Sequence, residues 1–269
     1  DEEQQEGYWP RVADAVLQRA LRASGAVQIV GAKWCGKTET AKQQAQSAVY
    51  LQDPDEGPSL VALAEVRPSV LLEGAEPHLI DEWQMAPQLW DAVRFAIDQG
   101  KGKGKGRFIL TGSATPKKRP KHSGVGRISR MHMRPMSLFE SRESTGVVSL
   151  AGLFDGAAEV GALSDRSIED IAFALCRGGW PEAVLESDPE IALDQAKNYV
   201  AELLDSDIDE MDDKKRNSTW LRAILRSYAR NLSTEASQAT IAADMGGESP
   251  SENTVADYLD ALRRTHVSE

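Results

Sequence analysis

The feature that most constrains how this chain can fold is the eight-residue segment 31–38, which reads G-A-K-W-C-G-K-T. It satisfies the pattern G-x-x-x-x-G-K-[ST] at every specified position. A short apolar run, 26–30, precedes it, and a helix is expected to begin at Lys37. A strand, a glycine turn and a helix N-terminus in this order can surround a phosphate with backbone N–H groups. The context therefore favours a phosphate-binding P-loop over a chance glycine turn.

Residues of this loop have distinct expected roles in holding a nucleotide. Lys37 would reach the β and γ phosphates, and the Thr38 hydroxyl would ligate Mg²⁺. Cys35, beside Lys37, also allows a redox-sensitive thiol as an alternative interpretation. The predicted nucleotide-binding residues here are Gly31, Ala32, Lys33, Trp34, Cys35, Gly36, Lys37, Thr38 and Glu39.

A second segment supplies groups suited to hydrolysis. The apolar run 79–82 ends in Asp81 and Glu82. Asp81 would hold the magnesium water shell from a neighbouring strand, and Glu82 would act as a general base on the attacking water. Such a pair can also simply cap a helix, but its place after the P-loop favours hydrolysis over transfer to a small acceptor. Thr111 and Ser113 end the next strand, where they would contact the γ phosphate unless T-G-S is only a turn.

Positive charge is concentrated in one part of an acidic chain. The formal net charge is −11, yet residues 99–139 hold eleven Lys or Arg and no Asp or Glu. This asymmetry predicts a basic face for an anion, which could be ATP, an acidic neighbouring subunit or nucleic acid. Within the stretch, Arg127 follows two glycines and is the predicted arginine finger. Arg130 and Arg134 are competitors, and a merely solvated loop is the simpler alternative.

Apolar periodicity predicts the fold class. Strands are expected at 26–30, 49–52, 78–81, 107–111 and 130–133, and helices at 11–23, from 37, within 60–72 and at 87–97. Alternating strands and helices predict a three-layer α/β P-loop fold with a mostly parallel sheet. Further helices are expected at 189–208, 219–231, 238–245 and 251–264. The expected domains are a tail and helix (1–24), an ATPase core (25–155), a helical lid-like region (156–216) and a winged-helix-like three-helix unit (217–269).

Several other classes of protein are disfavoured. Cys35 and Cys176 are the only cysteines, and the four histidines show no zinc spacing, which suits a reducing cytoplasm. No apolar run approaches the roughly 18 to 20 residues of a membrane span, and the acidic start is unlike a secretory signal. No N-K-x-D follows the P-loop, which counts against guanine specificity, and T-G-S-A is not a serine-hydrolase elbow. The acidic segment 205–213 fits a solvated face better than a metal site.

Eight segments together carry a family resemblance. They are 8–11 (Y-W-P-R), the P-loop 31–38, 79–84 (L-I-D-E-W-Q), 108–113 (F-I-L-T-G-S), 123–127 (S-G-V-G-R), 136–140 (M-S-L-F-E), 177–182 (R-G-G-W-P-E) and 258–262 (Y-L-D-A-L). In these the chain resembles a family of prokaryotic AAA-type ATPases that join a P-loop domain to a winged-helix region and a nuclease-like C-terminal domain. The resemblance implies ATP and Mg²⁺ as ligands, with Lys37, Thr38, Asp81 and Glu82 in their family roles. It also implies that the nuclease-like part is not encoded in these 269 residues.

Three functions from different classes remain open. The leading prediction is a Mg²⁺-dependent ATPase whose nucleotide state changes how the core packs on the helical and terminal regions. It could be a homo-oligomer through Arg127, and a DNA-associated version gains limited support, because 217–264 holds five arginines against six acids. The alternative is a nucleotide-gated signalling or protein-interaction switch with slow hydrolysis. A small-molecule phosphotransferase is third, disfavoured by Glu82.

Overall fold

The computed structural model describes residues 7–100, 104–112, 124–156, 161–204, 216–232, 234–245 and 250–266. Its five strands are β1 (Ala26–Val30), β2 (Ser47–Tyr50), β3 (His78–Asp81), β4 (Phe108–Gly112) and β5 (Ile128–His132). They form one sheet in the order β2-β3-β4-β1-β5, and every pairing is parallel. The predicted parallel α/β fold is confirmed. The expectation that Asp81 comes from a strand next to the P-loop strand is wrong, because β4 lies between β3 and β1.

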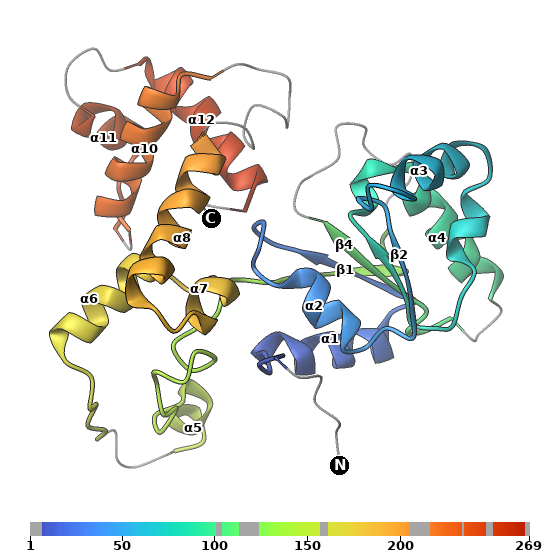
Figure 1. Cartoon of the computed structure of the whole chain (residues 1–269), viewed down its shortest axis with the longest axis horizontal. Helices are drawn as coiled ribbons and strands as arrows, with labels where there is room; N and C mark the ends of the chain where they lie inside the picture. Colours follow the sequence, from blue (N-terminus) through green and yellow to red (C-terminus); the bar gives the residue numbers. More distant parts are fainter. Residues whose placement is uncertain are drawn as a thin grey trace.

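Helices cover both faces of the sheet, as a buried parallel sheet requires. They are α1 (Val12–Ala23), α2 (Lys37–Lys42), α3 (Gly57–Val66) and α4 (Gln88–Gln99), with 3₁₀ turns η1 (Pro68–Leu72) and η2 (Trp83–Met85). Helices α3 and α4 lie on one side of the sheet, and α1 and α2 on the other (Figure 1). Every residue of β1, β3 and β4 is buried. Strand β2 ends at Tyr50 rather than at the predicted 52, because apolar Leu51 is buried outside the ladder.

After β5, the regular elements of the described chain are helices, joined by irregular segments such as 133–149. These helices are α5 (Leu150–Phe154), α6 (Ile168–Arg177), α7 (Pro181–Leu185) and α8 (Pro189–Glu202), then α10 (Ser218–Arg230), α11 (Gln238–Asp244) and α12 (Glu252–Arg264). The last three share their own apolar core, and the Ser251 hydroxyl caps α12 by accepting from the Thr254 N–H. Residues 216–266, where described, hold helices without a strand, so the likeness to a winged helix rests on the three helices. Helix α8 begins at Pro189, as predicted for the helix at 189–208, and residues 205–208 of that prediction lie outside the described residues.

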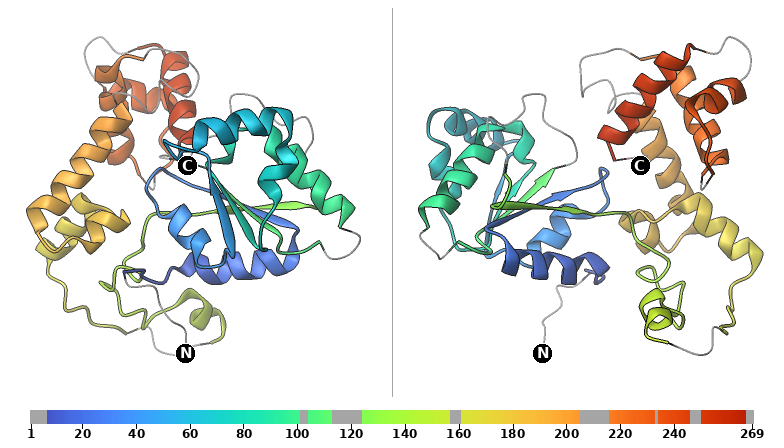
Figure 2. Two further views of the ribbon diagram at one scale, coloured as in Figure 1. Left: turned by 45° about the vertical axis from the view of Figure 1, so that its right-hand side comes forward. Right: turned by 180° about the vertical axis from the view of Figure 1, so that it is seen from behind.

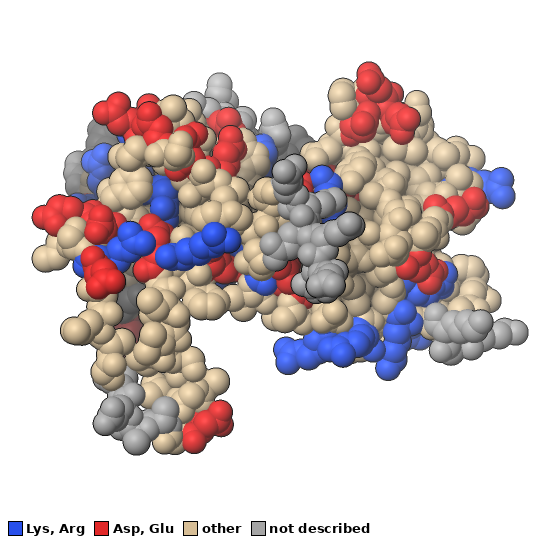
Figure 3. All heavy atoms as spheres, turned by 60° about the horizontal axis from the view of Figure 1, so that its bottom comes forward, with Lys and Arg blue, Asp and Glu red and all other residues tan. Residues whose placement is uncertain are grey.

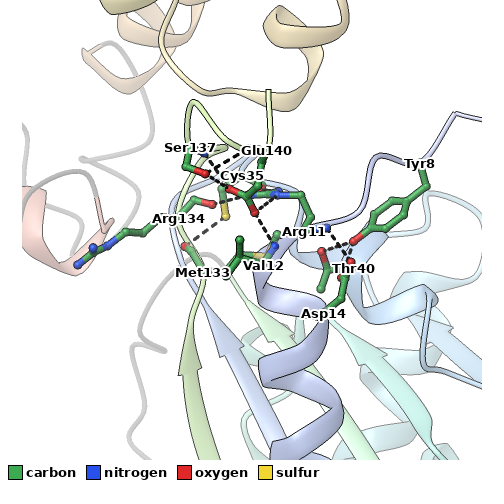
Figure 4. Close-up of polar contacts among 10 residues, drawn as sticks. All are labelled: Tyr8, Arg11, Val12, Asp14, Cys35, Thr40, Met133, Arg134, Ser137 and Glu140. Carbon is green, nitrogen blue, oxygen red and sulfur yellow. Dashed lines mark hydrogen bonds and ion pairs between the residues drawn. The ribbon is translucent and has the colours of Figure 1, made fainter. Parts of the chain in front are cut away.

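Two halves are visible in Figure 2: the sheet half, residues 7–135, and the helical half, residues 161–266, joined by the segment that follows β5. A buried ion pair fastens this segment to the P-loop. Arg11 Nε lies 3.0 Å from Glu140 Oε1, while its two Nη atoms donate to the carbonyls of Cys35 (2.9 Å) and Arg134 (2.8 Å) (Figure 4). Burial alone would raise the pKa of Glu140, but N–H groups of Ser137 and Val12 and the Arg11 charge together hold that pKa below its usual value.

A second ion pair ties the connecting segment to α6. Both Nη atoms of Arg177 meet the Glu143 carboxylate, at 3.1 and 2.7 Å. Two residues on, Gly179 accepts a backbone hydrogen bond from the Met136 N–H at 2.6 Å. A Cβ at Gly179 would stand 2.1 Å from the Met136 carbonyl oxygen, so only glycine fits there. Segments 136–140 and 177–182, far apart in sequence, are therefore one structural unit.

None of the helices in the described ranges combines the length and apolar character that crossing a membrane requires.

We expect Glu140→Gln to lower the free energy of unfolding by about 1–3 kcal/mol at neutral pH, because it leaves the buried Arg11 guanidinium without its counter-charge. The folded-state pKa of Glu140 lies below its usual value, so its stabilisation is present above that usual value and is lost as the pH falls. Denaturant unfolding at several pH values measures this. Glu65→Gln, at an exposed position of α3, is the control. A destabilisation that persists undiminished in acid would contradict the assignment.

Candidate functional site

The P-loop lies between β1 and α2 and is held close to β5. A Cβ at Gly31 would stand 2.1 Å from the Met133 carbonyl oxygen, and Gly36 has a φ of 96°, so both positions require glycine. Lys37 is buried, and its Nζ donates to the carbonyls of Gly31 (3.1 Å) and Ala32 (2.8 Å). The loop therefore curls around its own ammonium group, at the position predicted for phosphates.

Beside the loop, the Asp81 carboxylate joins three other elements. Asp81 is fully buried, and its Oδ1 accepts from the hydroxyls of Thr38 (2.7 Å) and Thr111 (2.5 Å). Its Oδ2 accepts from the Gln52 amide at 3.3 Å. Three predicted site residues from α2, β3 and β4 thus meet at the carboxyl edge of the sheet. Thr38 and Asp81 together offer the kind of oxygen ligands that Mg²⁺ prefers.

Glu82 follows directly and faces the adjoining cavity. It has a φ of 53° and a ψ of 45°, the left-handed region that non-glycine residues rarely adopt. Its carboxylate accepts a hydrogen bond from the Gln84 amide. Glu82 precedes η2 but makes no side-chain cap to it, so the helix-capping interpretation is not supported. Backbone strain of this kind commonly marks a functional residue.

A cavity of about 600 Å³ opens between the P-loop and the helical half. Trp34 of the P-loop contacts Tyr199 of α8, with ring centroids 5.7 Å apart, and Tyr199 contacts Trp180 at 4.0 Å. The apolar pattern of the sequence did not predict that these aromatic residues line a cavity, and segment 177–182 was indicated only by the family resemblance. The cavity is lined by Lys33, Trp34, Gly36, Lys37, Thr38, Glu39, Gln52, Glu82, Trp180, Pro181, Glu182, Ala183, Gln195, Asn198, Tyr199 and Glu202.

A smaller hollow of about 290 Å³ adjoins the first. The two share Gly36, Glu39 and Pro181. Its remaining walls are Gly7, Tyr8, Trp9, Arg11, Met136 and Leu185. Tyr8 is fixed there because its hydroxyl donates to Asp14 Oδ1 at 2.6 Å (Figure 4). The N-terminal segment therefore belongs to the site, which the chain's periodicity did not predict.

The structure does not support the alternative role of Cys35 as a redox-sensitive thiol. Its side chain is fully buried, and its Sγ donates to the Met133 carbonyl at 3.6 Å. Burial raises the pKa of the Cys35 thiol, whereas a reactive thiol needs a lowered one. The thiol packs the loop against β5.

The three candidate arginines lie in different places. Arg127 directly precedes β5, at the edge of the sheet opposite the P-loop, and its Nε lies 2.8 Å from Asp98 Oδ1. It therefore cannot reach the phosphate site of its own chain. Arg130 Nε donates to Gln28 Oε1 at 3.2 Å, within the sheet. Arg134 follows β5, and its side chain points away from the ion pair between Arg11 and Glu140 (Figure 4).

Part of the predicted basic stretch falls in segments that the structure does not describe. Ser113, Arg119 and the lysines at 101, 103, 117, 118 and 121 lie outside the described residues. On the face drawn in Figure 3, acidic side chains are spread over both halves, and basic ones lie along the lower edge of the sheet half and also across the helical half.

Comparisons with known proteins agree with this geometry. Residues 23–141 match a family model described as an AAA domain, and residues 168–269 match one described as a domain of unknown function (DUF8612). No curated protein sequence matches the chain. The Walker-type ATPase paby2304 of Pyrococcus abyssi is similar in structure, with a TM-score of 0.55 and 14% identity over 98% of this chain and 91% of that chain. This likeness shows a shared fold.

Weaker structural matches include two further solved structures. One is a replication initiator DnaA bound to AMPPCP and single-stranded DNA, at a TM-score of 0.39 and 15% identity over 97% of this chain and 89% of that one. The other is a single-residue variant of Thermotoga maritima RuvB. Its TM-score is 0.33, with 18% identity over 93% of this chain and 85% of that chain. TM-scores this low do not establish a shared overall fold.

The burial of Cys35 predicts unequal reactivity of the two thiols. An aromatic disulfide reagent should label exposed Cys176 quickly and Cys35 only after denaturation. Spectrophotometric counting of thiols in native and unfolded protein measures this, with Cys176→Ser as the control that removes the fast phase. Rapid labelling of the Cys176→Ser variant in its native state would show that Cys35 is accessible after all.

Proposed function

We propose that this chain, whose residues 23–141 form an AAA-type P-loop domain, binds ATP with Mg²⁺ and hydrolyses it. The observation that carries the proposal is the Asp81 carboxylate, which is fully buried and accepts from Thr38 of the P-loop and Thr111 of β4. Nothing in folding alone requires a charge at that depth, since an apolar residue there would cost less. A divalent cation bound through Thr38 and Asp81 explains it.

Each residue then has a chemical task. Lys37 exchanges its two carbonyl partners for the β and γ phosphates, and Thr111 stays on Asp81 at the γ-phosphate end. Glu82, at the wall of the cavity, takes the proton of the attacking water. Mg²⁺, when bound, supplies positive charge for the developing negative charge on the phosphates. The hollow of Tyr8, Trp9 and Met136 suits the base, because it adjoins the phosphate cavity at Gly36.

Nucleotide occupancy is expected to affect the helical half through direct contact. Trp34 belongs to the P-loop itself, and its ring meets Tyr199 of α8. A phosphate that rearranges the loop would therefore shift α8 in the same step. The nucleotide-gated switch remains the alternative, with the same binding residues but slow turnover. A DNA-associated role stays a prediction, since two of the terminal arginines already pair with acids, Arg230 with Asp244 and Arg264 with Asp260.

A second copy of the chain is expected to complete the site. Of the described residues lining the main cavity, the cationic ones are Lys33 and Lys37, and neither is an arginine. Arg127 lies at the far edge of its own sheet, half-exposed and bound to Asp98. We therefore propose that it acts as a finger on the phosphates of a neighbouring copy rather than on its own.

Binding and turnover should separate in two variants. Lys37→Ala should abolish both ATP binding and hydrolysis, because the phosphates lose their buried cation. Glu82→Gln should retain binding while hydrolysis falls by about 100-fold or more, because the base is lost. Calorimetric titration and phosphate release measure the two properties, with Lys105→Ala at an exposed position as control. Unchanged slow turnover in Glu82→Gln would favour the switch, and normal affinity in folded Lys37→Ala would refute the P-loop assignment.

If Arg127 acts between copies, activity per chain should rise with protein concentration. Arg127→Ala alone should lower turnover by about 10³-fold or more, the range measured for arginine fingers. Mixing it with Lys37→Ala protein should restore activity, since one variant keeps the P-loop and the other keeps the finger. Arg94→Ala is the matched control, because Arg94 also pairs with Asp98, at 3.1 Å, without being the proposed finger. Concentration-independent turnover by a monomer, with no recovery on mixing, would defeat the idea.

A further inference from the structure

We infer that Gln84 is a positioning residue for hydrolysis, one that holds the Glu82 carboxylate and links it to the carboxyl end of β4. The inference rests on the proposed function, because it assigns a role within the same reaction. It concerns a residue that touches neither of the hollows assigned above to the phosphates and the base.

The two ends of the Gln84 amide have different surroundings. Its Nε2 donates to Glu82 Oε2. Because a carboxylate can only accept, this bond fixes which end of the amide is nitrogen and turns Oε1 the other way. Oε1 is buried and has no hydrogen-bond partner among the described residues. An unsatisfied buried acceptor costs about 1–3 kcal/mol, so its retention needs a reason.

The neighbour of this oxygen is Gly112, the last residue of β4. A Cβ built on Gly112 would stand 2.4 Å from Gln84 Oε1. Gly112 follows Thr111, whose hydroxyl is on Asp81. The strand end expected to meet the γ phosphate therefore packs directly against the side chain that restrains the expected base.

The backbone conformation of Glu82 gives a reason why its side chain needs to be positioned by a neighbour. Its backbone is in the left-handed region, which costs about 1–3 kcal/mol for a residue with a side chain. The carboxylate on that strained backbone needs a further restraint to direct an oxygen into the cavity. The amide supplies this restraint by donating to Glu82 Oε2. Gln84 thus acts through Glu82, and its loss should affect the chemical step rather than nucleotide binding.

Two substitutions approach this contact from opposite sides. Gln84→Met keeps the length of the side chain but removes the amide, and Gly112→Ala places a methyl group where Oε1 now lies. Each should lower kcat by about 10- to 100-fold, the effect of losing a residue that orients a catalytic group, with KM and ATP affinity within about twofold of the wild type. The double variant should be little worse than either single one, because both disturb one contact.

Matched controls separate this role from general damage. Gln99→Met, at an exposed position ending α4, and Gly104→Ala, where a Cβ meets nothing closer than 3.6 Å, should leave kcat unchanged. A normal kcat in folded Gln84→Met, with activity lost in Glu82→Gln, would overturn the inference and leave the proposed function standing. A fall in kcat together with ATP affinity would overturn it too, as a structural effect. Absence of turnover in the wild type would refute both.

Discussion

The structure depends most on one buried carboxylate. Asp81 ends β3 with no exposure to solvent, and its carboxylate oxygens accept hydrogen bonds from the P-loop helix (Thr38), from β4 (Thr111) and from the segment after β2 (Gln52). Burying a charge without partners would cost several kcal/mol, so the three donors and the strands that carry them must be in place together. The same oxygens that hold the sheet edge together are those a divalent cation would bind. Stability and the proposed chemistry therefore share one set of atoms.

A second arrangement holds the P-loop from the outside. Arg11 contacts the loop at Cys35 and the connecting segment at Glu140, and Gly179 packs against Met136 within that segment. These contacts give a physical reason why three segments that are remote in sequence carry one resemblance. The P-loop is contacted by the N-terminal segment, which binds the residues after β5, and these in turn bind the segment just before α7. We therefore expect a substitution in any of these segments to disturb the conformation of the P-loop.

How much could be predicted follows from the range of the forces involved. The P-loop, the strand before it and the acids at 81 and 82 were predictable, because each depends on neighbours in sequence. The place of β4 between β3 and β1 was not, since strand order arises from long-range pairing. Nor was the distance of Arg127 from its own P-loop, because a basic loop looks the same at either edge of a sheet. The contact between Trp180 and Tyr199 was not predictable either, because the two residues are far apart in sequence and meet only through the packing of α7 against α8.

The charge of the cavity wall bears on how the helical half could respond to nucleotide. The helices contribute Glu182 and Glu202 to the wall beside Trp180 and Tyr199, whereas the cationic residues Lys33 and Lys37 come from the P-loop. Electrostatic attraction between this wall and a triphosphate would therefore be weak or repulsive. Under the proposed function, a change in the P-loop would reach the helical half through the aromatic contact between Trp34 and Tyr199. Under the proposed function, a further cation for phosphoryl transfer would come from outside this wall, and Arg127 of a second copy is its proposed source.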